Sequence, residues 1–82
     1  MRILDTDNQG PVRRIHVYLT PGEAEKLTRA LNRLLLDPEA SEAQRVLADD
    51  STRDLSVSIV TPAKLQDTKR YTDAERRMFA EP

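Results

Sequence analysis

The junction between residues 12–19 and the segment that follows constrains the fold of this 82-residue chain more than any other feature. In residues 14–19 polar and apolar side chains alternate, the polar ones being Arg14, His16 and Tyr18 and the apolar ones Ile15, Val17 and Leu19. A period of two puts the apolar side chains on one face of an extended chain. The pattern therefore predicts a half-buried strand over residues 12–19.

The next four residues carry the signals that start a helix. Thr20 can cap the helix, Pro21 fits its first position, and Glu23 completes a capping box with Thr20. An apolar stripe follows, made of Ala24, Leu27, Leu31, Leu34 and Leu35. Asp37 precedes Pro38 and is therefore driven out of helical geometry. The sequence predicts a helix over residues 21–36.

Three further strands are predicted, at residues 2–5, 44–49 and 55–60. Turn-forming residues at 7–11 return the first of them to pair antiparallel with residues 12–19. Residues 39–50 also have helix propensity, and we choose a short strand at 44–49 that leads through an acidic turn into the last strand.

The predicted fold class is α+β, a two-layer ββαββ arrangement with a largely antiparallel four-stranded sheet and one main helix on one face. We expect a core domain over residues 1–62 and, over residues 63–82, a polar connector and a short C-terminal helix that Thr72 and Glu75 start with a second capping box. One helix is narrower than a four-stranded sheet. Part of the sheet is thus left for the C-terminal helix or another molecule to cover.

The expected core is a single apolar layer between the helix and the sheet. Its inward residues are chiefly Ile15, Val17, Leu19, Leu27, Leu31, Leu34, Leu35, Leu55, Val57 and Ile59. A domain of this size without disulfides depends on such a core for its stability.

Composition excludes several classes of site. The chain has no cysteine and a single histidine, which removes thiolate chemistry, cysteine zinc sites and histidine pairs within one chain. The pair Asp49-Asp50 is interpreted as a solvated turn, and Asp5-x-Asp7 as a hairpin turn rather than a calcium loop, since His16 stands where the closing glutamate would be needed. We expect a non-enzymatic protein with no catalytic residues, no metal and no cofactor.

Localisation and partner class follow from the charge and apolar patterns. No apolar run is long enough for a membrane span or a signal peptide, so we expect a cytoplasmic protein that does not bind membranes. The formal net charge is −1, which gives no global electrostatic case for nucleic acid. A homodimer, a protein partner or both are the favoured associations.

The candidate interface residues are Arg14, His16, Tyr18 and Leu36. The first three form the outward row of the predicted strand, and such a row can bind a protein, enter a DNA groove or pair with a second copy. Leu36 is expected on the side of the helix opposite Leu27, where it is either folded under in the loop or part of an interface.

Residues 13–35 resemble the strand and first helix of a ribbon-helix-helix repressor. The resemblance implies a dimer whose outward strand side chains, here Arg14, His16 and Tyr18, enter the major groove. It covers under a third of the chain, and that family continues with a second helix, whereas this chain has a strand pattern at 55–60. The order of motifs along the whole chain is also similar to a group of small uncharacterised bacterial proteins, which supports the layout and implies no activity.

Three functions of different classes follow from these patterns. The favoured one is a regulatory or immunity-type protein-interaction module that binds through an open sheet face or an edge strand. The alternative is a dimeric DNA-binding regulator that uses residues 14–18. The third, a small enzyme subunit or cofactor binder, depends on His16 or a carboxylate lying in a pocket.

Overall fold

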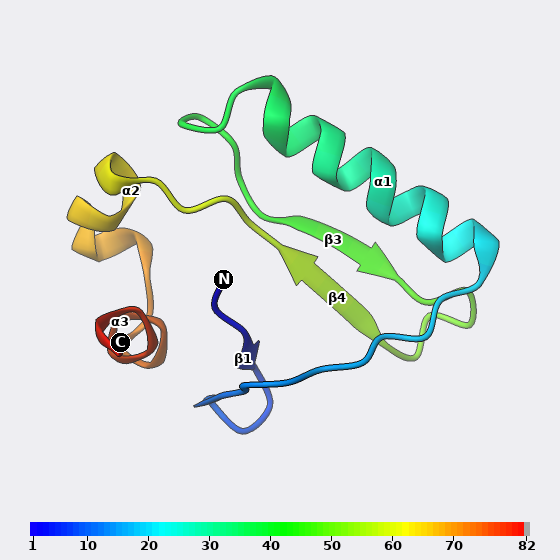
Figure 1. Cartoon of the computed structure of the whole chain (residues 1–82), viewed down its shortest axis with the longest axis horizontal. Coiled ribbons are helices and arrows are strands. Elements are labelled where there is room, and N and C mark those ends of the chain that lie inside the picture. Colours follow the sequence, from blue (N-terminus) through cyan, green and yellow to red (C-terminus); the bar gives the residue numbers. More distant parts are fainter. Residues whose placement is uncertain (82) are drawn as a thin grey trace. The chain divides into compact units, whose positions relative to one another are not determined.

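The computed structural model describes residues 1–81 and shows a small α+β fold with two two-stranded antiparallel sheets, a main helix and a short C-terminal helix (Figure 1). In chain order the elements are β1 (Leu4–Asp5), β2 (Gly10–Pro11), α1 (Pro21–Leu36), β3 (Gln44–Leu47), β4 (Asp54–Val57), α2 (Pro62–Gln66), the 3₁₀ helix η1 (Thr68–Arg70) and α3 (Asp73–Ala80). The predicted α+β class is confirmed.

The chain divides into two compact units. The helix–hairpin unit spans Tyr18–Leu65 and contains α1, β3 and β4, while the terminal unit joins Met1–Val17 to the described residues from Gln66 onward. The division into a core domain over residues 1–62 and a C-terminal segment over residues 63–82 stays a prediction.

Helix α1 has the predicted bounds and the predicted start. The Thr20 side chain accepts a hydrogen bond from the backbone of Glu23, and the Glu23 side chain accepts one from the backbone of Thr20. Ala30 and Leu34 are its buried residues. The side of the helix that is buried is centred on Ala30 and Leu34, whereas the predicted stripe included the next residue after each of them. Leu31 and Leu35 are therefore exposed, at 44% and 65%. These two residues were wrongly assigned to the core.

The β3–β4 hairpin lies against α1, which runs alongside β3 in the opposite direction (Figure 1). Gln44 lies opposite Val57 and Leu47 opposite Asp54. Val46 is buried, and its cross-strand neighbour Leu55 is half-buried. Both predicted strands of the hairpin are present but shorter than predicted: the one expected at 44–49 ends at Leu47, and the one expected at 55–60 begins at Asp54 and ends at Val57.

The predicted strand over residues 12–19 is wrong for this structure. In residues 1–19 strand pairing is limited to β1 and β2, where Leu4 lies opposite Pro11 and Asp5 opposite Gly10. The N–H of Val12 also donates to Ile3 O at 2.8 Å. Residues 13–19 belong to no strand, and Ile15, Val17 and Leu19 are exposed rather than core residues. Alternation describes side-chain faces, whereas a strand also requires a hydrogen-bonded neighbour. The described strands consequently form two sheets instead of one four-stranded sheet.

The terminal unit is built on α3. The Thr72–Glu75 capping box is formed as predicted, and Ala74 and Met78 are the buried residues of this helix. Tyr71 meets Phe79 edge to face, with ring centroids 5.0 Å apart. Helix α3 contacts β2, which places the C-terminal helix against the N-terminal strand pair.

Candidate functional site

The candidate interface residues are all exposed, and the structure does not gather them into one site. Arg14 and His16 lie in the terminal unit, in the segment after β2, and form no row on a strand face. Tyr18 and Leu36 are 82% and 85% exposed at opposite ends of α1. A helix of 16 residues is about 24 Å long, so these two side chains do not share a contact surface. Their role as an interface stays a prediction.

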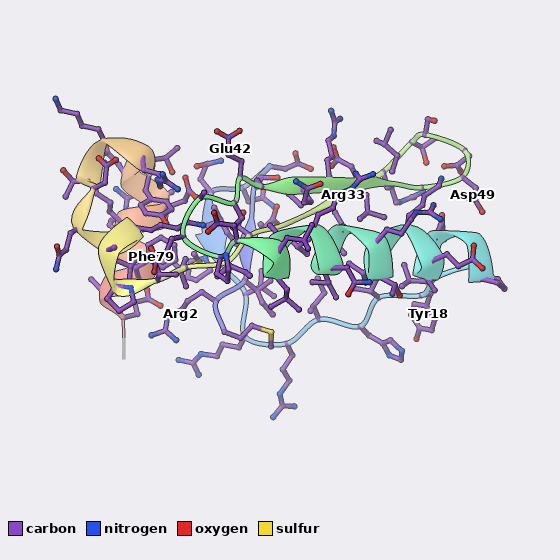
Figure 2. The ribbon with its side chains drawn as sticks, turned by 90° about the horizontal axis from the view of Figure 1, so that it is seen from above. Arg2, Tyr18, Arg33, Glu42, Asp49 and Phe79 are labelled. Atoms are coloured by element: carbon purple, nitrogen blue, oxygen red, sulfur yellow. The ribbon has the colours of Figure 1, made fainter. Side chains whose placement is uncertain are left out.

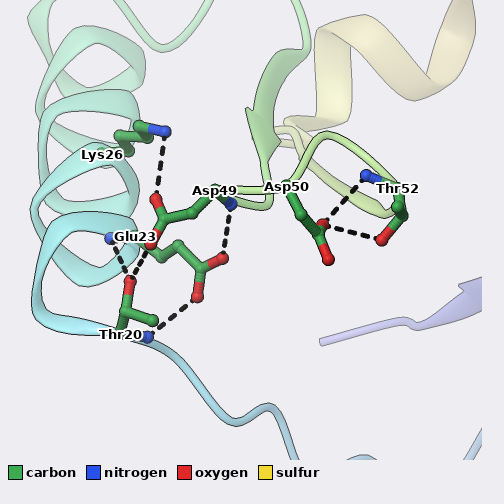
Figure 3. Close-up of polar contacts among 6 residues, drawn as sticks. All are labelled: Thr20, Glu23, Lys26, Asp49, Asp50 and Thr52. Atoms are coloured by element: carbon green, nitrogen blue, oxygen red, sulfur yellow. Dashed lines mark hydrogen bonds and ion pairs between the residues drawn. The ribbon is translucent and has the colours of Figure 1, made fainter.

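A polar cluster joins the start of α1 to the turn between β3 and β4 (Figure 3). Thr20 Oγ1 donates to Asp49 Oδ2 at 2.7 Å, and the N–H of Asp49 donates to Glu23 Oε2 at 2.8 Å. The N–H of Thr20 donates to Glu23 Oε1, also at 2.8 Å. The ammonium of Lys26 lies 3.6 Å from Asp49 Oδ1. Helix start and hairpin turn are therefore held together by one carboxylate from each.

Hydrogen bonds lower the pKa of two carboxylates in this region, Glu23 and Asp50. The N–H of Thr20 and then that of Asp49 lower the pKa of Glu23. The hydroxyl and then the N–H of Thr52 lower the pKa of Asp50. A general acid needs a raised pKa, so both shifts run opposite to what proton donation near neutral pH requires. The cluster acts as a structural connection.

The flank of α1 that faces β3 is basic. Lys26, Arg29 and Arg33 follow one another at i, i+3 and i+7, which places them along one side of the helix. Figure 2 shows Arg33 on the β3 side of α1 and Tyr18 on the other side. We call Lys26, Arg29 and Arg33 the basic flank.

A shallow groove of about 270 Å³ separates the basic flank from β3. Its lining consists of Lys26, Arg29, Ala30, Arg33, Gln44, Arg45 and Leu47. Arg45 pairs with Asp54 and Lys26 with Asp49. Within the described residues neither Arg29 nor Arg33 has an ion-pair partner. The groove thus has two cationic side chains that no described residue neutralises.

The outer edge of β3 forms one side of this groove. Ala48 N–H donates to Arg53 O at 2.9 Å across the turn, and opposed pairs in an antiparallel ladder alternate between hydrogen-bonded and non-hydrogen-bonded. Ala48 and Arg53 form a hydrogen-bonded pair, so the pair of Val46 and Leu55, two positions back, is hydrogen-bonded as well. Arg45 and Leu47 belong to the non-hydrogen-bonded pairs, and their N–H and C=O groups therefore point away from β4. No hydrogen bond among the described residues engages those outward groups. This β3 edge is the kind of template that accepts an additional strand.

The opposite flank of α1 is apolar. Ala24, Leu31 and Leu35 lie at i, i+7 and i+11, and both leucines are exposed. We call these three residues the apolar flank. The same helix consequently presents a basic surface on one side of its buried line and an apolar surface on the other.

Among the described residues, Lys64 is the only charged residue that is buried, with 5% of its surface exposed. Its ammonium donates to Ser41 O and Ser41 Oγ, both at 2.9 Å, and to Ile59 O at 3.0 Å. It ties the loop after α1 to the segment after β4. No local pattern around Lys64 indicates this role, because Ser41, which supplies two of the three acceptors, lies 23 residues earlier in the chain.

Sequence reasoning did not single out the basic flank, although the spacing of Lys26, Arg29 and Arg33 was available as a signal. In the described chain neither Arg29 nor Arg33 forms an ion pair. In residues 1–81 no group of three or more potential ligands is arranged to hold a metal ion, and no helix is long and apolar enough to cross a membrane.

No protein-family model, curated protein or solved structure matches this chain.

Proposed function

We propose that the protein is a non-enzymatic interaction module that binds a protein partner through the β3 edge. The observation that carries this proposal is the pair of outward-facing N–H and C=O groups on Arg45 and Leu47, lying beside an open groove. An extended peptide that adds to a sheet edge gains main-chain hydrogen bonds from the edge and specificity from the side chains around it. The groove volume, about 270 Å³, falls below the roughly 300–1,000 Å³ typical of small-molecule pockets.

The test is selection of binders from a displayed library of random peptides, using the full chain as bait. Proline at position 47 removes an outward N–H and leaves the bonds between β3 and β4 intact, because proline is tolerated on an edge strand. Selected peptides are expected to bind Leu47→Pro at least about tenfold more weakly than the parent, since they lose a hydrogen bond and strand geometry.

Two matched controls make this experiment specific. Leu47→Val keeps the N–H and tests the side chain alone, and Ser56→Pro removes an outward N–H from the other edge of the hairpin. Both are expected to bind like the parent. If no peptide is enriched, or if Leu47→Pro binds as well as the parent, the β3 edge is not the binding surface.

A second candidate function is self-association through the apolar flank. It is favoured by the exposure of Leu31 and Leu35 in a unit whose fully buried apolar residues are Ala30, Leu34 and Val46. Light scattering coupled to size exclusion is expected to give a dimer for the parent and a monomer for the double variant Leu31→Glu, Leu35→Glu. A monomeric parent at about 100 μM, well above the micromolar affinity of weak complexes, would exclude this candidate.

The DNA-binding alternative is a separate proposal. It requires residues 14–18 to become a strand by pairing with a second copy, and its support is the alternation of those residues. In the described chain β3 and β4 follow α1, where a ribbon-helix-helix protein has its second helix. Promoter DNA at low salt is expected to bind less tightly after Arg14→Ala under this alternative, and indifference to that substitution rules it out.

A further inference from the structure

Cations are concentrated in the groove beyond what the charge of its unit would produce. Residues 18–65 include six basic and eight acidic side chains, a net charge of −2. Four of the six basic residues line the groove, and none of the acidic residues does. The groove therefore carries positive charge within a unit whose net charge is negative.

Arg29 and Arg33 are the two cations with charge to offer. They lie four positions apart, so their Cα atoms are separated by about 6 Å along the helix axis. Side chains on one face of an extended strand repeat about every 6.6–6.8 Å. A strand lying parallel to the axis of α1 therefore meets the two guanidinium groups with every second side chain. Figures 1 and 2 both show β3 running along α1, which gives a strand added to β3 this direction.

We infer that the β3 edge takes an extended acidic segment of a partner protein, with carboxylates at alternate positions facing Arg29 and Arg33. The inference rests on the proposed function and names the partner's chemistry. Guanidinium groups bind carboxylates through two parallel hydrogen bonds, which suits Arg29 and Arg33 to this ligand. The intervening side chain of the segment points away from α1, to the face that carries Arg45 and Leu47.

The β3 edge distinguishes a peptide from a nucleic acid. Arg45 and Leu47 each present a donor and an acceptor, and a peptide backbone satisfies both at the repeat of a strand. The phosphate backbone of DNA only accepts hydrogen bonds and would leave the two carbonyls without donors. Nucleic-acid binding also draws on a wider excess of positive charge than a unit of net charge −2 provides.

The test measures fluorescence anisotropy of labelled nine-residue peptides added to the full chain. The probe alternates glutamate and valine, one control has the same composition with its glutamates in one block, and a second replaces glutamate by lysine. A single-stranded 12-mer DNA serves as the nucleic-acid probe. The alternating peptide is expected to bind at least about tenfold more tightly than either control, with the affinity falling as salt screens the pairs. It is also expected to protect the amides of Arg45 and Leu47 from hydrogen exchange.

Charge-reversed variants locate the contact. Arg29→Glu with Arg33→Glu is expected to weaken the alternating peptide by at least about tenfold, because two attractive pairs become repulsive. Lys69→Glu with Arg70→Glu changes the net charge equally at two exposed residues outside the candidate interfaces and is expected to alter affinity less than about twofold. Arg29→Gln with Arg33→Gln provides a milder pair should the first variant not fold.

The outcomes separate this inference from the proposed function. Equal binding of the blocked peptide, tighter binding of DNA, or equal loss in the Lys69, Arg70 variant overturns the acidic-segment inference. If the random library yields neutral or basic peptides that depend on the N–H of Leu47, the module binds at the β3 edge and the inference about charge is wrong. If the library yields no binder of any charge, both fall.

Discussion

Replacing Lys64 by methionine should lower the free energy of unfolding by about 2 kcal/mol, because two carbonyl groups lose their hydrogen-bond donor at a cost of about 1 kcal/mol each. The ammonium of Lys64 donates to two backbone carbonyls, Ser41 O and Ile59 O, and to Ser41 Oγ. Methionine keeps an unbranched stem of similar length and removes all three donors. The Ser41 hydroxyl can turn to water, but the two carbonyls are fixed by the backbone. An unsatisfied buried acceptor costs about 1–3 kcal/mol, and half-buried residues place these two at the low end.

Urea unfolding at pH 7 measures the change in the free energy of unfolding. In thermal unfolding the melting temperature is expected to fall by roughly 8–16 °C. Lys69→Met is the matched control because Lys69 is exposed, and it should change stability by less than about 0.5 kcal/mol. Hydrogen exchange should show faster opening at residues 39–43 and 58–61. If Lys64→Met is as stable as Lys69→Met, or more stable than the parent, the cost of burying the ammonium outweighs its hydrogen bonds and the reasoning fails.

Two further predictions concern the helix starts. Hydrogen bonds from Thr20 and Asp49 lower the pKa of Glu23 in the folded chain, so its stabilising contribution is complete above the unfolded pKa and is lost as pH falls through the lower folded one. Glu23→Gln should therefore lower the free energy of unfolding at pH 7, and the variant should lose less stability than the parent as the pH falls below about 5. Urea unfolding at a series of pH values measures this, and it contradicts the prediction if the free energy of unfolding falls with pH equally steeply in parent and variant. Thr72→Ala should cost about 1 kcal/mol by removing the cap of α3, seen as faster amide exchange in that helix. Thr68→Ala is its control, since the Thr68 hydroxyl makes no hydrogen bond in the described chain, and equal exchange in the two variants would show that the cap does not hold α3.

The two main helices could be predicted from the sequence because their signals are local. Each capping box requires a threonine and a glutamate three residues apart, and both boxes form as predicted. The turn at residues 49–52 is also local, with Asp50 accepting hydrogen bonds from Thr52. Neighbours in the chain are enough to determine such features.

The path of residues 13–19 could not be predicted in the same way. Their alternation says which side chains share a face, and it contains no information about which strand lies beside them. The core shows a similar limit. The apolar stripe of α1 is broad enough to bury either Leu31 or Ala30, and packing on a narrow hairpin leaves Ala30 and Leu34 inside.

The candidate site divides along the same line. Sequence alone determined that Lys26, Arg29 and Arg33 lie along one side of a helix, because helical periodicity depends only on spacing. Tertiary structure decided that this side faces the outer edge of β3 and that Arg45 and Leu47 turn their backbone groups toward it. It also decided that the ammonium of Lys64 is buried against Ser41, which lies 23 residues earlier in the chain. Those relations join segments far apart in the chain, and they depend on packing rather than on any local preference.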